Sequence, residues 1–125
     1  MIIGIGTDIV DVHRIQRLLD GNSRFIERVF TAAEIGYCNT RANPAQSYAA
    51  RFAAKEALMK ALGTGWDGVI NWLDIEVRMD QLGKPLLQIH GATKTRLEAL
   101  GCDRIHLSLA HEKDHALAMV VLEAN

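Results

Sequence analysis

The stretch from Arg51 to Gly65 places the strongest constraint on how this chain folds. Its sequence is RFAAKEALMKALGTG, and six alanines lie between Ala49 and Ala61. Alanine has the highest helix propensity, and glycine often ends a helix in a left-handed conformation. We therefore predict a long helix over residues 45–62 that stops at Gly63. Its small side chains would let another backbone approach closely.

This predicted helix also carries an unusual concentration of charge. Glu56 and Lys60 are four residues apart and share one face, as do Arg51 and Lys55. Such spacing alone is typical of a solvated face with one ion pair. A functional interpretation needs support from residues elsewhere in the chain.

The first ten residues predict a strand in which two glycines share a side with an acid. The side chains alternate, with Ile3, Ile5, Thr7 and Ile9 on one side and Gly4, Gly6, Asp8 and Val10 on the other. Glycine weakens a strand and often marks a place where a ligand or another backbone comes close. The ordinary interpretation of Asp8 is a cap for the next helix. Asp11 can fill that role, so Asp8 remains a candidate functional residue.

The remaining elements follow from hydrophobic periodicity and turn residues. We expect helices over 12–19, 24–30, 31–39 and 92–100, and strands over 72–80, 86–90, 104–110 and 116–122. The last strand is almost continuously apolar and is predicted to be central and buried on both faces. This order predicts a single α+β domain over residues 1–125, with a largely antiparallel sheet packed against the long helix.

Composition excludes some classes of function. The net charge of −1 gives no overall attraction to nucleic acid or membrane, so any basic recognition surface must be local. The longest apolar run, 116–122, is too short to span a bilayer. The N-terminus lacks the basic region of a secretory signal. Cys38 and Cys102 show neither metal-ligand nor redox spacing, and we expect a reducing cytoplasm.

The candidate chemistry rests on two carboxylates, Asp8 and Glu56, with Lys60 one helical turn from Glu56. No nucleophile motif and no zinc-type spacing is present. Mg²⁺ typically takes one or two protein carboxylates together with phosphate oxygens and water. The sequence thus predicts a site that handles Mg²⁺ and phosphate. Of the five histidines, His111 is kept as a candidate because it lies at a strand end beside Ser108.

Two further features each leave two interpretations open. The glycine-rich loop after residue 62 is either a phosphate cradle or a plain turn. The basic residues of the second and third elements are either an ordinary solvated face or a docking surface for an acidic partner. These residues are Arg14, Arg17, Arg24 and Arg28.

Taken together, these motifs resemble a known family. The sequence GIGTDIV from Gly4, then Arg14, then the Arg51–Gly65 stretch, then Gly83-Lys84-Pro85, are similar to the holo-acyl-carrier-protein synthases. These are the small bacterial type of 4′-phosphopantetheinyl transferase, and the match follows nearly the whole chain in order. The resemblance implies the fold of that family and homotrimers with active sites between subunits. It also implies transfer of the 4′-phosphopantetheine arm of coenzyme A to a serine of apo-acyl carrier protein, with release of adenosine 3′,5′-bisphosphate, in fatty acid biosynthesis.

The same resemblance implies roles for individual residues. Asp8 and Glu56 would hold Mg²⁺, Glu56 or a water it orients would take the serine proton, and Lys60 would stabilise the departing phosphate. The residues that would line the coenzyme A pocket are Arg51, Lys60, Gly63, Thr64, Gly65, Lys84, Pro85, Ser108 and His111, with Lys84, Ser108 and His111 on the adenine side and its 3′-phosphate. The residues that would dock the acidic recognition helix of the carrier protein are Arg14, Arg17, Arg24, Phe25 and Arg28.

Two alternatives to the transferase remain. One is a non-catalytic module that binds coenzyme A or a carrier protein, which the intact Asp8, Glu56 and Lys60 disfavour. The other is a different Mg²⁺-dependent phosphate-ester enzyme, which the arginines and the Gly83-Lys84-Pro85 turn disfavour. The transferase requires Asp8 and Glu56 to lie close enough to share one ion.

Overall fold

The computed structural model describes residues 1–21, 24–63 and 70–125. The predicted order of strands and helices is confirmed, with a short 3₁₀ helix, η1, added before β2. The elements are β1 (Ile2–Asp11), α1 (Val12–Asp20), α2 (Phe25–Val29), α3 (Ala32–Asn39), α4 (Pro44–Leu62), η1 (Trp72–Asp74), β2 (Ile75–Met79), β3 (Pro85–Ile89), α5 (Gly91–Ala99), β4 (Arg104–His111) and β5 (His115–Glu123).

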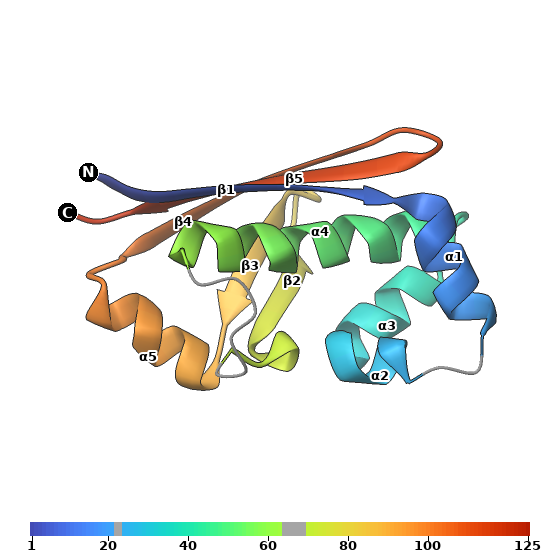
Figure 1. Cartoon of the computed structure of the whole chain (residues 1–125), viewed down its shortest axis with the longest axis horizontal. Coiled ribbons are helices and arrows are strands. Elements are labelled where there is room, and N and C mark those ends of the chain that lie inside the picture. Colours follow the sequence, from blue (N-terminus) through green and yellow to red (C-terminus); the bar gives the residue numbers. More distant parts are fainter. Residues whose placement is uncertain (22–23, 64–69) are drawn as a thin grey trace.

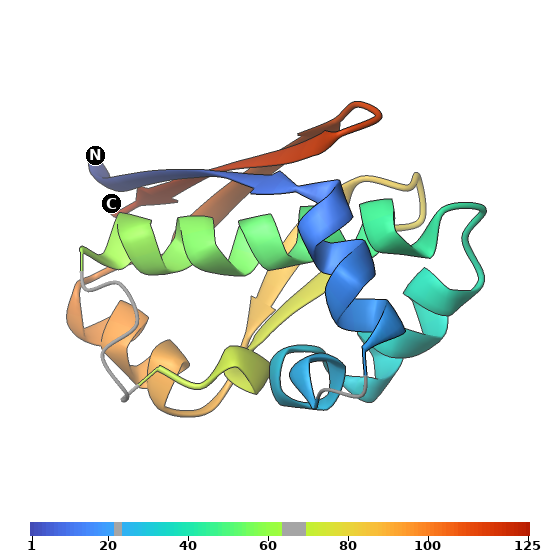
Figure 2. The same ribbon diagram turned by 45° about the vertical axis from the view of Figure 1, so that its right-hand side comes forward.

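The strands form two antiparallel sheets, as the α+β prediction requires. β1, β5 and β4 form a three-stranded sheet in that order, and β2 pairs with β3 in a separate hairpin. Helix α4 runs along the three-stranded sheet, with α2, α3, α5 and the hairpin on its other side (Figures 1 and 2). The long helix is therefore the central layer of the domain.

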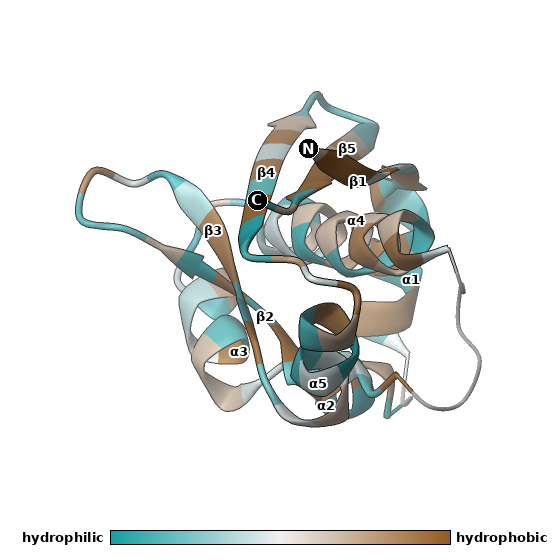
Figure 3. Ribbon diagram, turned by 90° about the vertical axis from the view of Figure 1, so that its left-hand side faces the viewer, coloured by the Kyte–Doolittle hydropathy of each residue, from teal (hydrophilic) through white to brown (hydrophobic). Residues whose placement is uncertain are grey.

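The prediction for β5 is half wrong. The strand is central, but only its inner side chains are buried, whereas Leu117 and Met119 on the outer face are exposed. The physical reason is that α4 covers one face of the sheet and leaves the other open (Figure 2). The neighbouring strand β1 is also largely apolar, as its mostly brown colouring shows (Figure 3).

Helix α4 has the predicted bounds to within one residue. The Asn43 side chain accepts a hydrogen bond from the Gln46 N–H at 3.3 Å, Pro44 occupies the first turn, and Gly63 ends the helix with a φ of 80°. The interpretation of a solvated charged face is wrong for Arg51 and Lys55, although Lys60 is exposed. Arg51 is 5% exposed and Lys55 0%, because packing on both sides buries most of the helix surface.

Gly4 and Gly6 let β1 lie directly against α4. A Cβ atom added to Gly6 would overlap the Ala57 carbonyl oxygen and lie 2.6 Å from the Ala61 nitrogen. One added to Gly4 would overlap the Ala61 carbonyl oxygen. The predicted close approach of the two backbones is confirmed. It depends on glycine in the strand and alanine in the helix together.

The strand predicted over 72–80 begins three residues later than expected. The Asn71 side chain accepts a hydrogen bond from the Leu73 N–H at 3.0 Å, and the Asp74 N–H donates to the Asn71 carbonyl at 3.0 Å. These bonds fold Trp72–Asp74 into η1. A capping asparagine thus overrides the alternating pattern, and the Trp72 ring is turned toward Phe52 with centroids 5.3 Å apart.

Candidate functional site

Asp8 and Lys60 form an ion pair between β1 and α4. The Lys60 Nζ donates to the Asp8 Oδ1 at 2.9 Å. The Asp8 side chain is 15% exposed and that of Lys60 51% exposed, so the pair lies at the surface end of the strand–helix contact. Spacing alone predicted an ion pair between Glu56 and Lys60 within the helix. In the structure Lys60 of α4 pairs instead with Asp8 of β1.

Glu56 lies beside this pair. Partial burial raises the pKa of its carboxyl group, the charge of Asp8 raises it further, and Lys60 and Arg14 act in the opposite direction. The charges of Asp8, Lys60 and Arg14 therefore all act on the Glu56 carboxyl group. The structure brings Asp8, Glu56 and Lys60 together, as the sequence predicted, and adds Arg14 to their surroundings.

The donor set at this point fits a hard divalent cation. Asp8 and Glu56 supply carboxylate oxygens as ligands, and a bound cation would offset the part of the increase in the Glu56 pKa that the charge of Asp8 adds to the effect of burial. Within the described residues, no group of three or more His, Cys, Asp or Glu side chains could hold a metal. A cation held by Asp8 and Glu56 would complete its shell with substrate oxygens and water, which is the usual arrangement for Mg²⁺.

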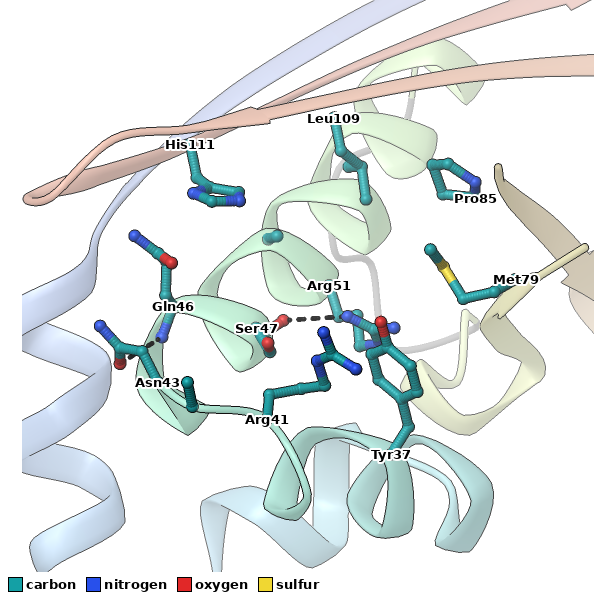
Figure 4. A pocket seen from close by; sticks show the side chains of 12 residues that line it. Tyr37, Arg41, Asn43, Gln46, Ser47, Arg51, Met79, Pro85, Leu109 and His111 are labelled. Carbon is teal, nitrogen blue, oxygen red and sulfur yellow. Dashed lines mark hydrogen bonds between the residues drawn. The ribbon is translucent and has the colours of Figure 1, made fainter. Parts of the chain in front are cut away.

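A second site lies at the other edge of the sheet, in a cavity of about 410 Å³. It brings together Arg51, Pro85 and His111, which the sequence predicted for coenzyme A, and Figure 4 shows their side chains around one space. Sequence reasoning missed the other lining residues. They include Tyr37, Arg41, Asn43, Gln46, Ser47, Met79 and Leu109.

Two arginines in this cavity share one aromatic ring. The guanidinium carbons of Arg51 and Arg41 lie 4.3 and 5.2 Å from the centroid of Tyr37. The Arg51 Nη1 donates to the Ser47 carbonyl at 3.4 Å, while its buried Nε has no hydrogen-bond partner. A buried donor without a partner costs about 1–3 kcal/mol. Two neighbouring cations and an unsatisfied donor favour an anionic ligand such as phosphate, which arginine binds with two parallel hydrogen bonds.

Not all predicted coenzyme A residues reach this cavity in the structure. Ser108 lies on the exposed outer face of β4, because side chains alternate along a strand and Leu109 faces inward. Lys84 lines a neighbouring depression of about 210 Å³ beside His106. Gly63 is the C-cap of α4, and Thr64 and Gly65 lie outside the described residues.

A groove of about 560 Å³ opens next to Glu56. Arg14, Arg24 and Arg28 line it together with Phe25, as the docking prediction requires, but Arg17 does not. Its apolar lining includes Leu18, Val29, Phe52 and Trp72, with Phe25 and Phe52 5.5 Å apart between centroids. The groove thus combines an apolar floor with a basic rim. This suits an acidic amphipathic helix.

Comparison with known proteins gives consistent matches in sequence. The 4′-phosphopantetheinyl transferase superfamily matches residues 4–120. The chain is 47% identical over 124 residues to the holo-[acyl-carrier-protein] synthase of Koribacter versatilis, covering 98% of this chain and 99% of that one. It is 49% identical over 125 residues to the same enzyme of Trichlorobacter lovleyi, covering 99% of each chain.

Solved structures agree with these matches. The holo-[acyl-carrier-protein] synthase of Neisseria meningitidis superposes with a TM-score of 0.89 at 42% identity, covering 98% of this chain and 99% of that one. The synthase of Bacillus anthracis in complex with CoA (3′,5′-ADP) gives a TM-score of 0.83 at 40% identity, covering 100% of this chain and 99% of that one. The likeness therefore extends over the whole chain in both sequence and fold.

Proposed function

The chain belongs to the 4′-phosphopantetheinyl transferase superfamily, and we propose that it transfers the 4′-phosphopantetheine moiety of coenzyme A to a serine of apo-acyl carrier protein, for fatty acid biosynthesis. One observation carries this function. Asp8, Glu56 and Lys60, from a strand and a helix, converge beside a groove with a basic rim. That arrangement supports phosphate transfer next to a surface that can bind an acidic protein.

Asp8 and Glu56 are the proposed ligands of Mg²⁺. When bound, the ion neutralises the pyrophosphate of coenzyme A and polarises the phosphorus under attack. The serine oxygen forms a bond to that phosphorus, and the phosphorus–oxygen bond to adenosine 3′,5′-bisphosphate breaks. Glu56, or a water that it orients, takes the serine proton. The Lys60 ammonium stabilises the negative charge on the departing phosphate.

Arg41 and Arg51 are the proposed binding residues for the phosphorylated nucleotide end of coenzyme A. Their cavity borders β4, whereas Asp8 lies on β1, and β5 separates the two strands. One protomer therefore presents its nucleotide cavity and its reacting groups at opposite edges of the sheet. A homotrimer in which the β4 edge of one subunit adjoins the β1 edge of the next would join them into a complete site.

The outer face of the sheet supports this assembly. Ile5 is 59% exposed, Ile9 64%, Leu117 43% and Met119 45%, and all four lie on the same face. A contiguous exposed apolar face of this kind usually marks a protein–protein interface. We propose that this face is covered by the other two subunits.

We expect Ile9→Glu to convert the trimer into monomers, because it places a charge in the apolar interface. Size-exclusion chromatography with light scattering measures the mass. Leu82→Glu is the matched control, since Leu82 is 94% exposed on the β2–β3 turn, away from this face. The monomer should also bind coenzyme A more weakly. An unchanged mass for Ile9→Glu would contradict the proposed interface.

We expect Arg14→Glu to raise the KM for the carrier protein at least ~10-fold, because it puts a negative charge on the rim that receives an acidic helix. The KM for coenzyme A should change much less. Arg17→Glu is the comparison, since Arg17 lies on the same helix but outside the groove. Steady-state kinetics at low and high salt test this, because salt screens such attraction. If wild type and Arg14→Glu had the same KM for the carrier protein, the groove lined by Arg14 would not be the docking surface.

We place the enzyme in the cytoplasm. Cys38 and Cys102 are both free thiols, and burial raises the pKa of the Cys38 thiol to about 11, so it resists oxidation. In the part of the chain that the structure describes, no helix has the length and apolar character needed to cross a membrane.

Mass spectrometry of the carrier tests the function as a whole. The protein is incubated with coenzyme A, Mg²⁺ and an apo-acyl carrier protein that a proven transferase modifies. The carrier should gain the mass of phosphopantetheine, and a chelator should prevent the gain. Binding of coenzyme A or carrier without any gain would favour the non-catalytic binding module.

A further inference from the structure

Lys55 is a fully buried cation with every donor satisfied. Its side chain is 0% exposed, and its Nζ donates to three oxygens: the Val29 carbonyl at 2.6 Å, the Glu34 Oε1 at 2.7 Å and the Trp72 carbonyl at 3.2 Å. An ammonium group has three N–H donors, so none is left for a substrate. Lys55 therefore cannot act directly in the reaction, although Glu56 is its neighbour in sequence.

Its carboxylate partner is equally well held. The Glu34 side chain is 0% exposed; its Oε1 also accepts from the Thr31 N–H at 2.9 Å, and its Oε2 accepts from the Val77 N–H at 2.9 Å. The Lys55–Glu34 pair thus connects α4 with the start of α3 and with β2. Through the two carbonyls, Lys55 also contacts α2 and η1.

Those two carbonyls belong to walls of the groove beside Glu56. Val29 and Trp72 both line it. Val29 is the last residue of α2, whose final carbonyls have no partner within the helix. The same short helix carries Phe25 and Arg28 on the groove. Trp72 stacks on Phe52 of α4, with the ring planes 21° apart. One ammonium therefore fixes the α2 wall and the η1 wall relative to α4.

We propose that Lys55 is a positioning residue for carrier-protein docking: it holds α2 and η1 at the separation that the recognition helix requires. This role rests on the proposed function, because it needs the groove to be the docking surface. A buried ion pair adds little net stability compared with apolar residues of similar volume. A contribution to the shape of the groove would explain why the Lys55–Glu34 pair connects five elements, namely α2, α3, α4, η1 and β2.

The test compares Lys55→Met with the double variant Glu34→Gln plus Lys55→Met. Lys55→Met leaves the Glu34 carboxylate buried without its cation, so it should lower the melting temperature strongly. The double variant removes that uncompensated charge and should recover part of the melting temperature. It still leaves the Val29 and Trp72 carbonyls without Lys55. The Kd for apo-carrier protein, measured by calorimetry, should therefore remain raised ~10-fold or more in the double variant, with the KM for coenzyme A nearly unchanged.

Leu97→Ala is the control for lost stability. Leu97 is a buried core residue of α5 that does not line the groove. It should lower the melting temperature and leave the carrier Kd unchanged. The positioning role would be overturned if the double variant recovered the carrier Kd together with its melting temperature, or if Leu97→Ala raised the Kd as much. If Arg14→Glu weakens binding of the carrier protein but the double variant does not, the groove is the docking surface and the proposed role of Lys55 is wrong.

Discussion

Replacing Glu56 by glutamine should reduce transfer by at least ~1,000-fold while leaving the protein folded. Glutamine has nearly the same shape but cannot accept the serine proton, and it replaces one of the two carboxylates proposed to hold Mg²⁺. The loss should appear in kcat/KM for both substrates, measured by carrier mass at fixed times. Glu98→Gln on the exposed side of α5 is the matched control and should keep the wild-type rate.

The same variant should be more stable than the wild type near neutral pH. The pKa of Glu56 is raised in the folded protein, chiefly by burial and then by Asp8, so ionising this group costs folding free energy above its ordinary pKa. Glutamine avoids that cost. The stability difference should therefore be present at pH 7 and disappear as the pH falls below the ordinary pKa of glutamate, when the wild-type carboxyl is protonated in both states. Thermal melts at pH 7 and pH 4 measure it.

If Glu56→Gln raises the stability of the protein but lowers its activity, Glu56 acts in the reaction and does not serve to stabilise the fold. If Glu56→Gln melted well below the wild type at pH 7, the lost activity would be explained by damage to the fold. If it transferred phosphopantetheine at the wild-type rate, Glu56 would have neither proposed role. Transfer by wild type should also decline at low pH, where Glu56 becomes protonated, because only the carboxylate accepts a proton or binds a cation.

The reacting groups could be predicted from sequence because each had a local signal. Asp8 stands out as an acid in an apolar strand, and Glu56 and Lys60 share a helix face at four-residue spacing. The spacing did not reveal that Lys60 pairs with Asp8, because that contact joins residues 52 apart in the sequence. The three residues were grouped because the chain carries no nucleophile motif and no zinc-type spacing, and the resemblance to a family then gave each of them a role.

The buried charges were missed for a related reason. Helical periodicity shows which residues share a face but not what covers that face. From sequence, Arg51 and Lys55 look like ordinary surface residues. In the structure α4 lies between two layers, and the Arg51 guanidinium packs over the Tyr37 ring while Lys55 pairs with Glu34. Likewise, the apolar composition of β5 indicated burial on two faces, whereas one of them is the open outer face of the protomer. Both cases depend on tertiary packing that a single sequence does not encode locally.

Replacing Gly6 by alanine should destabilise the fold by about 3 kcal/mol or more. The added Cβ would overlap the Ala57 carbonyl oxygen and lie 2.6 Å from the Ala61 nitrogen, and backbone atoms inside a helix cannot move aside as a side chain can. Relief requires β1 to shift away from α4. Urea unfolding followed by circular dichroism measures the change in the free energy of unfolding.

Gly36→Ala is the control, because it makes the same chemical change within α3, where a Cβ would meet no atom within 4 Å. It should stabilise the protein by up to about 1 kcal/mol, since alanine has the higher helix propensity. The two glycines should thus differ in the sign of their effect. Gly6→Ala protein that remains folded should also lose activity, since Asp8 follows two residues later and moves with the strand away from Glu56. A stable, fully active Gly6→Ala variant would mean that the strand–helix contact does not hold the two carboxylates together.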